Sequence, residues 1–315
     1  PAVPTRAFKG AELCAFPPEA ARVVYLTSGT TLPGRRGRHL LESTALYDAA
    51  LLPNFARHLL PDLEPGGRMR LFSLFPPPSV LPHSSLGHMI ARCLDEFGDA
   101  QSGYAFDAAG LDDERLLGWL RAAADAGTPV GLLGTSTSLI EFLDRLAARG
   151  CRLRLPPASR VMDTGGYKGS GRRVEPEALR ALYEEYLGIP PAYAVNEYGM
   201  TELGSQFYDA CLADAVLGAP ADAPSRAKVI PPWVRTLAVD PETLEPLPPG
   251  EVGLLCHIDL ANRGSVAAIQ TEDLGRLVPA GGSFRFELLG RAPGAEPRGC
   301  SIAVSEILAA ARTAP

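Results

Sequence analysis

The sequence predicts an α/β protein that begins with mostly parallel sheets covered by helices and ends with a small antiparallel β subdomain. From residue 22 to residue 195, short β-rich runs alternate with amphipathic helical patterns, as in strand–helix–strand units. After residue 220, short strands follow one another directly, separated by turns that contain glycine and proline. The length of 315 residues suits one large domain or two modest ones, at about 150 residues per domain.

The individual elements follow from hydrophobic periodicity and from capping residues. In the first part, strands are expected at 22–26, 68–73, 101–106, 129–133, 159–162 and 192–195. Helices are expected between them at 43–60, 85–97, 112–126, 136–149 and 175–187. Ser43 or Thr44 can cap the first helix, and Pro176 suits the first turn of the last. In the second part, strands are expected at 234–239, 253–257, 265–269, 275–278 and 283–288, and a short helix at 304–312.

This change of rhythm suggests three domains. We expect an α/β core at 1–220, a small β subdomain at 221–289 and a short tail at 290–315. Residues 219–232, which are rich in proline and alanine, are the best linker candidate.

Composition excludes several classes of protein. The formal net charge of −6 argues against a nucleic-acid binder, which normally carries a basic surface that matches phosphate. No apolar run reaches the 18 residues that a membrane-spanning helix needs, and the first residues do not resemble a signal peptide. The six cysteines are widely spaced without a Cys-x-x-Cys pair, so we expect reduced thiols in a cytoplasmic protein.

The first segment with chemical potential is Tyr-Leu-Thr-Ser-Gly-Thr-Thr-Leu-Pro-Gly-Arg-Arg at residues 25–36. An expected strand runs into hydroxyls and glycines and then into basic residues. Glycines let the backbone approach a phosphate, hydroxyl and amide groups donate to its oxygens, and arginines supply charge. The alternative is an ordinary turn with capping hydroxyls, and the Gly-Lys-Ser/Thr of a P-loop is absent.

The second segment is Tyr-Ala-Val-Asn-Glu-Tyr-Gly-Met-Thr-Glu at residues 193–202. A strand ends in an aromatic–glycine turn that then presents a hydroxyl and a carboxylate. The aromatic ring can stack on a purine, and Glu202 can hold Mg²⁺. The alternative is a strand that exits into a turn with a solvated glutamate.

Together, these two segments resemble the adenylate-forming superfamily of acyl- and aryl-CoA synthetases and luciferases. Asp-Thr-Gly-Gly-Tyr-Lys-Gly at 163–169 and Arg-Gly-Cys-Ser at 298–301 are most similar to the acyl-protein synthetases. That group includes the synthetase subunit of the bacterial bioluminescence fatty-acid reductase complex. Further matches at 4–9, 84–89 and 290–291 extend the resemblance over nearly the whole chain.

The resemblance implies the N-terminal domain of an adenylate-forming enzyme, which activates a fatty or aryl carboxylic acid with ATP and Mg²⁺. Glu202 would hold Mg²⁺, Thr201 would contact the α-phosphate and Asp273 would bind the ribose hydroxyls. The remaining nucleotide contacts would come from Thr27, Ser28, Gly29, Thr30, Thr31, Gly165, Gly166, Tyr198, Gly199 and Arg291. Without the resemblance, Asp273 reads as a turn residue.

Lys168 is a further candidate. The chain has 3 lysines against 27 arginines, and a compact ammonium group suits contact with a single phosphate or carboxylate oxygen. An ordinary loop lysine is the alternative.

Two departures from the superfamily pattern concern the phosphate loop and the lid. The usual Gly-x-Pro-Lys continuation of the loop is Leu-Pro-Gly-Arg at residues 32–35. Only 24 residues follow Arg291 (315 − 291), below the roughly 50 that a small domain needs, so we expect no full C-terminal lid.

Cys300 lies in the Arg-Gly-Cys-Ser segment that resembles the family's acyl-accepting cysteine. A thiolate attacks a mixed anhydride readily, and Arg298 would lower the thiol pKa from its free value of about 8.5. The alternative is an unreactive tail cysteine. His39, His58 and His257 have no partner at a catalytic spacing in the sequence.

Three functions therefore remain open. The first is an acyl-protein synthetase that passes the acyl group to Cys300 or to a partner. Its possible protein partners are an acyl acceptor and an acyl donor. The second transfers the acyl group to coenzyme A, to a carrier protein or to an amine. The third is a nucleotide-binding scaffold without catalysis.

Overall fold

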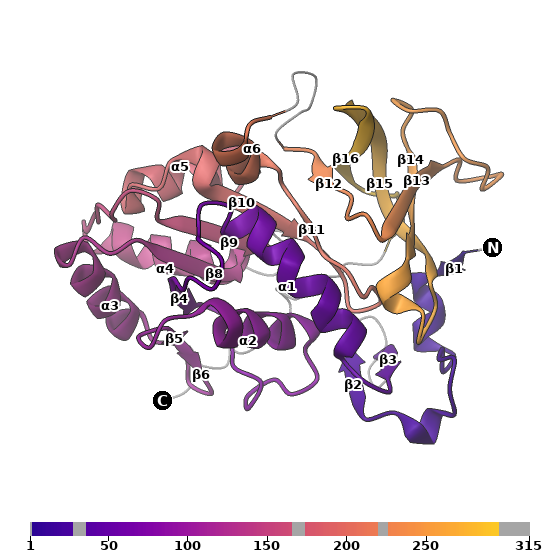
Figure 1. Ribbon diagram of the computed structural model, residues 1–315, viewed down its shortest axis with the longest axis horizontal. Coiled ribbons are helices and arrows are strands. Elements are labelled where there is room, and N and C mark those ends of the chain that lie inside the picture. The colour runs from indigo at the N-terminus through magenta and orange to yellow at the C-terminus, as the bar shows by residue number, and fades with distance from the viewer. Residues whose placement is uncertain (1, 28–35, 166–173, 220–225, 296–315) are drawn as a thin grey trace. The chain divides into compact units, whose positions relative to one another are not determined.

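The computed structural model describes residues 2–27, 36–165, 174–219 and 226–295 (Figure 1). The predictions for Ser28, Gly29, Thr30, Thr31, Gly166, Lys168, Cys300 and the helix at 304–312 lie outside these residues. The described residues form two compact units. The first unit combines the chain up to His58 with the chain from Tyr198 onward, and the second unit is Leu59–Glu197.

The second unit is built on a parallel sheet with the strand order β10 (Ala194–Tyr198), β9 (Arg160–Thr164), β8 (Val130–Thr135), β4 (Arg70–Ser73) and β5 (Gly103–Tyr104). Every residue of β8 and β9 is buried. Burial on both faces is typical of central strands in a helix-covered parallel sheet. Because the strands are parallel, their carboxyl ends meet at one edge of the sheet, where α/β proteins bind ligands.

Four helices follow these strands: α2 (Ser85–Phe97), α3 (Asp113–Asp125), α4 (Ser136–Ala148) and α5 (Pro176–Leu187). Three begin at a side-chain cap, in which Ser84, Asp112 or Thr135 accepts a hydrogen bond from the backbone amide three residues on. The short elements η3 (Pro191–Tyr193), β6 (Phe106–Asp107) and β7 (Gly110–Leu111) complete the unit.

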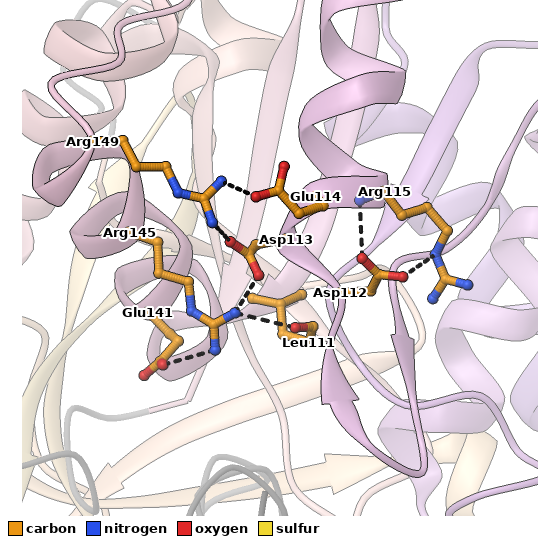
Figure 2. Close-up of polar contacts among 8 residues, drawn as sticks. All are labelled: Leu111, Asp112, Asp113, Glu114, Arg115, Glu141, Arg145 and Arg149. Carbon is orange, nitrogen blue, oxygen red and sulfur yellow. Dashed lines mark hydrogen bonds and ion pairs between the residues drawn. The ribbon is translucent and has the colours of Figure 1, made fainter. Parts of the chain in front are cut away.

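An ion-pair network joins the start of α3 to the end of α4 (Figure 2). The Asp113 carboxylate accepts from Arg145 and Arg149, both at 2.5 Å, and Arg149 also pairs with Glu114 at 2.8 Å. Arg145 bonds in addition to Glu141 at 3.1 Å. Acidic groups at a helix start and basic groups at a helix end also complement the two helix dipoles.

The first unit is built on an antiparallel sheet with the strand order β12 (Lys228–Val229), β16 (Ser283–Arg291), β15 (Ala268–Ala280), β14 (Gly253–Asp259) and β13 (Val234–Val239). Strand β1 (Val3–Pro4) pairs in parallel with β15. The core of the unit includes Phe8, Phe207, Leu255, Ile269 and Phe286.

The other elements of the first unit come from both of its chain segments. They are η1 (Thr5–Lys9), η2 (Pro18–Ala20), the antiparallel pair β2 (Val23–Leu26) and β3 (Arg38–Leu41), α1 (Ala45–Leu59), β11 (Phe207–Tyr208), α6 (Cys211–Leu217) and η4 (Leu260–Asn262).

The predicted class, α/β with an antiparallel second part, is confirmed, and several details differ. The strand predicted at 101–106 is divided into β5 and β6. The strand predicted at 22–26 does not join the parallel sheet, because β2 pairs antiparallel with β3. The strands predicted at 265–269 and 275–278 are one strand, β15, because the alternation of buried and half-buried residues continues through 270–274. The three domain ranges describe element types rather than compact units, and they stay a prediction.

Candidate active site

Thr27 closes the base of the first sequence motif. It follows β2 directly and is buried. Its backbone amide donates to the Gly37 carbonyl at 2.9 Å, and its Oγ1 accepts from the Gly37 amide at 2.9 Å. A Cβ on Gly37 would lie 2.9 Å from Thr27 Oγ1 and 3.1 Å from the Phe8 backbone. Glycine at 37 is therefore needed for the two ends of the loop to meet.

The second motif forms a buried turn directly after β10. Thr201 and Glu202 are both buried, and the Leu203 amide closes the turn on the Met200 carbonyl at 3.1 Å. The ring nitrogen Nδ1 of His39 donates to the Thr201 carbonyl at 2.6 Å. Since His39 is paired with Tyr25 in the β2–β3 hairpin, this bond joins the second motif to the hairpin that leads into the first.

The residues after Glu202 are fixed against η4. The Asp259 carboxylate accepts from the Gly204 amide at 3.0 Å, from Ser205 Oγ at 2.8 Å and from the Ala261 amide at 2.9 Å. Burial raises the pKa of Asp259, although these hydrogen bonds act in the opposite direction. A Cβ on Gly204 would lie 2.8 Å from the Ala261 backbone, so no side chain fits at this position.

Tyr198, Asp273 and Arg291 come together although 93 residues (291 − 198) separate the first from the last. The Tyr198 hydroxyl donates to Asp273 Oδ2 at 2.9 Å, and Arg291 Nη1 lies 3.3 Å from Asp273 Oδ1. Arg291 also pairs with Glu272 at 2.9 Å. Asp273 and Arg291 are direct partners in the β15–β16 register, which explains their contact.

The Tyr198 ring lies in an aromatic cluster. Its centroid is 5.8 Å from that of Phe207, 5.9 Å from that of His257 and 5.8 Å from that of Phe286. Burial raises the pKa of Tyr198 well above its usual value, so the hydroxyl stays a donor to Asp273. The role of Tyr198 beside adenine stays a prediction.

In the second unit, polar groups collect at the carboxyl ends of three neighbouring strands. Thr164, at the end of β9, donates to the buried Glu197 carboxylate of β10. Ser136, directly after β8, donates to the Gly165 carbonyl at 3.3 Å. Gly165 has a φ of +83°, a conformation that favours glycine. Of the motif at 163–169, the structure describes only its first three residues.

The role of Glu202 beside Mg²⁺ stays a prediction. Among the described residues, no group of three or more His, Cys, Asp or Glu side chains could hold a metal ion. Mg²⁺ is usually bound through one or two carboxylates together with substrate phosphates, and the single carboxylate of Glu202 fits that pattern.

The cysteines that the structure describes are free thiols. Cys93 and Cys256 are buried, whereas Cys14 and Cys151 are half-buried. Cys211 is buried too, and burial raises its pKa to about 11. A raised pKa lowers the thiolate fraction, so Cys211 is a poor nucleophile.

Sequence reasoning missed several residues of these clusters, among them His39, Asp259, Ser136 and Glu197. The sequence does signal Ser136, because it lies in the run of hydroxyls at residues 135–138, shortly after the strand expected at 129–133. His39 carries no local signal, since its partner Thr201 lies 162 residues away.

No helix in the described part of the chain is long and apolar enough to cross a bilayer.

Comparison with known proteins gives matches by sequence and by structure. The sequence profile of the family described as "Acyl-protein synthetase, LuxE" matches residues 111–309. The "long-chain-fatty-acid--luciferin-component ligase" of Aliivibrio fischeri is 48% identical over 48 residues, which are 15% of this chain and 13% of the relative.

Two solved structures illustrate the structural similarity. A long-chain-fatty-acid-CoA ligase (FadD1) from Archaeoglobus fulgidus matches with a TM-score of 0.56 and 14% identity over 88% of this chain. ATP-bound MatB from Rhodopseudomonas palustris matches with a TM-score of 0.54 and 16% identity, also over 88%. The match spans 52% of the first solved chain and 49% of the second, so this chain has the fold of about half of each.

Proposed function

Since the chain belongs to the acyl-protein synthetase (LuxE) family, we propose that it activates a carboxylic acid with ATP and passes the acyl group to a protein thiol. A carboxylate oxygen of the acid attacks the α-phosphorus of ATP. The bond from this phosphorus to the bridging oxygen breaks, pyrophosphate leaves and an acyl-adenylate forms. In such chemistry the protein mainly positions the reactants and stabilises charge.

The observation that carries the proposal is the convergence of three distant motifs in the first unit. His39 bonds the turn of Thr201 to the hairpin that holds Thr27, and Tyr198 bonds Asp273. In the proposed site, Thr201 contacts the α-phosphate, Glu202 holds Mg²⁺ and Asp273 binds the ribose. Magnesium would neutralise charge on the phosphates when bound.

A fatty acid is the proposed substrate class. The Aliivibrio fischeri relative is named for a long-chain fatty acid, and so is the ligase from Archaeoglobus fulgidus. The acceptor in the proposed second step is Cys300: its sulfur attacks the carbonyl carbon of the acyl-adenylate, the carbon–oxygen bond breaks and AMP leaves. We place the protein in the cytoplasm, where thiols stay reduced.

Acid-dependent exchange of labelled pyrophosphate into ATP tests the first step. We expect exchange with long-chain fatty acids and a loss of about 100-fold or more in Glu202→Gln, since one electrostatic contact in an active site contributes about that much. Glu251→Gln, at an exposed position, is the matched control and should behave as wild type. If no acid tested, fatty or aryl, supports exchange, the proposed activation step is wrong and the nucleotide-binding scaffold remains.

A labelled acid tests the second step. We expect a hydroxylamine-labile label on the protein that is lost in Cys300→Ser and kept in Cys256→Ser, whose thiol is buried. Label that persists in Cys300→Ser would exclude this cysteine as the acceptor. Label that forms only on added coenzyme A, a carrier protein or an amine would favour the second class of acceptor.

A further inference from the structure

The side chain of His39 is buried in the first unit and has a defined hydrogen bond. It is 1% exposed, and its ring meets the Phe8 ring edge-on at 5.9 Å between centroids. A carbonyl oxygen only accepts hydrogen bonds, so the contact with Thr201 requires the proton on Nδ1. Burial lowers the pKa of His39 to about 4, and the ring is therefore neutral at neutral pH.

Asn262 makes the equivalent bond to the next residue of the turn. Its amide nitrogen donates to the Glu202 carbonyl at 2.7 Å and to the Val266 carbonyl at 2.9 Å, and the side chain is 1% exposed. Two consecutive carbonyls, those of Thr201 and Glu202, are thus held by side chains from β3 and from η4. These two elements lie more than 200 residues apart in the sequence.

Fixing two consecutive carbonyls fixes the peptide planes that carry them. The peptide group is planar, so the orientation of a carbonyl restricts the dihedral angles on both sides of it. The bond from Cα to Cβ then points in one direction at Thr201 and at Glu202. Groups that stabilise a reaction need this kind of support, because small errors in position cost large factors in rate.

We propose that His39 is a positioning residue for the nucleotide site: it holds the Thr201–Glu202 turn in a fixed orientation against the β2–β3 hairpin. Asn262 holds the next carbonyl of the same turn and completes this support. The inference rests on the proposed function, because His39 and Asn262 have this role only if Thr201 and Glu202 bind the nucleotide. His39 itself makes no contact with substrate in this role.

His58 provides a matched control inside the same unit. It is 2% exposed, its Nδ1 also donates to a backbone carbonyl, that of Asn54 at 2.9 Å, and burial also lowers its pKa to about 4. Its acceptor lies within α1, one helical turn away, and its ring stacks on Tyr208 at 5.5 Å. A purely structural role therefore predicts similar effects for the two histidines.

The test compares His39→Asn, His39→Gln, His39→Leu and His58→Leu. The asparagine amide nitrogen can take the place of Nδ1, whereas glutamine presents its amide where Nε2 would be and leaves the Thr201 carbonyl unpaired. The measurements are the Kd of Mg-ATP by calorimetry, kcat and KM for pyrophosphate exchange, and the midpoint of thermal unfolding.

We expect His39→Leu and His39→Gln to lower kcat/KM for ATP by about 10- to 100-fold and to weaken Mg-ATP binding, with His39→Asn recovering most of the loss. His58→Leu should lower the unfolding midpoint and leave kcat and the Kd near wild type at temperatures where it is folded. If His39→Leu does not fold, the ratio of kcat/KM for ATP between His39→Asn and His39→Gln decides.

Equal kcat and Kd in His39→Asn and His39→Gln would overturn the inference, as would equal losses in His39→Leu and His58→Leu. Either result with an active wild-type protein leaves the proposed function intact. A wild-type protein that neither binds Mg-ATP nor catalyses exchange would overturn the proposed function and this inference with it.

Discussion

The two units of the molecule differ in where they keep their buried polar groups. In the second unit, the central strands β8 and β9 are buried throughout, and many of its buried polar side chains lie at the strand ends. In the first unit, buried histidines and ion pairs are spread through the interior. Lys228 pairs with Asp209 at 2.9 Å and Arg285 with Asp214 at 2.7 Å, with at most 11% of each side chain exposed.

This difference has an energetic meaning. A buried polar group must keep its partner and its protonation state, which a buried apolar side chain does not have to do. The first unit should therefore be more sensitive to pH and to the loss of single partners. The two tryptophans of the chain allow a separate measurement, because Trp233 belongs to the first unit and Trp119 to the second. In Trp119→Phe and Trp233→Phe proteins, fluorescence reports one unit at a time.

The largest expected effect is acid destabilisation of the first unit. Burial lowers the pKa of His39 and His58 to about 4 and that of His257 to about 3, so the folded unit keeps these rings neutral. In the unfolded chain each of these histidines takes up a proton near pH 6.5. Above this pH, the contribution of the neutral, buried histidines to the free energy of unfolding is therefore complete. It is lost as the pH falls towards 4, on the order of 3 kcal/mol each for His39 and His58. The raised pKa of Asp259 opposes this loss only in part.

Urea unfolding at pH 7 and pH 5 measures this effect. We expect the Trp233 transition to move to lower urea at pH 5, and the Trp119 transition to move far less. In the second unit, Arg160 lowers the pKa of Asp62, and stability from this pair is lost only at pH values near or below 3.8. Replacing the exposed His83 of the second unit is the control and should change neither transition. Equal shifts in the two units would contradict the comparison.

The next largest effect is expected from breaking one ion pair in each unit. Lys228→Met removes the buried cation that pairs with the buried Asp209 carboxylate at 2.9 Å and should lower the free energy of unfolding of the first unit by about 3 kcal/mol. Asp113→Asn, in the network of Figure 2, should cost the second unit about 1 kcal/mol or less, because its arginine partners are a third or more exposed. The same single-tryptophan proteins measure both. A larger loss from Asp113→Asn would reverse the comparison.

A smaller difference in the free energy of unfolding is expected between two glycine-to-alanine variants, one in each unit. Gly204→Ala places a Cβ 2.8 Å from the Ala261 backbone, which cannot move without disturbing η4, and should cost about 2–3 kcal/mol. Gly131→Ala in β8 meets the end of the Leu71 side chain at 2.6 Å, which can adjust, and should cost less. Thermal unfolding of both variants tests the order. A loss in Gly131→Ala that equals or exceeds the loss in Gly204→Ala would be inconsistent with it.

The smallest expected effect is a gain in the second unit. Gly118 is an exposed residue inside α3 with nothing within 4 Å of an added Cβ. Gly118→Ala should stabilise this unit by about 0.5–1 kcal/mol, because alanine favours the helix and restricts the unfolded chain. The Trp119 transition should move to higher urea and the Trp233 transition should stay. No shift, or a loss, would point to strain that the structure does not show.

How well the fold could be predicted also differs between the units. The helix at Ser85–Phe97 was predictable to the residue, since a capping serine precedes a strong apolar period. Strand β3 was missed, because Arg-His-Leu-Leu shows no alternation and becomes a strand only by pairing with β2. Local patterns describe the second unit well because the residues of this unit that the structure describes form one continuous stretch. They describe the first less well because its two segments are far apart.

The same limit applies to the candidate site. Thr201 and Glu202 could be predicted because they lie in one short motif. The contact of Asp273 with Arg291 depends on the register of β15 and β16, and the bond of His39 to Thr201 depends on packing between distant segments. Such contacts have no signature in the local sequence.

The division of the chain also sets an order of assembly during synthesis. Residues up to His58 leave the ribosome first, yet their partners in the same unit begin only at Tyr198. At about 5–20 residues per second, the intervening stretch takes on the order of ten seconds to make. Leu59–Glu197 has been made by then, whereas the hydrophobic side chains of β2 and α1 still lack the part of their unit that begins at Tyr198. A nascent chain of this protein is thus most exposed to aggregation before the antiparallel sheet emerges.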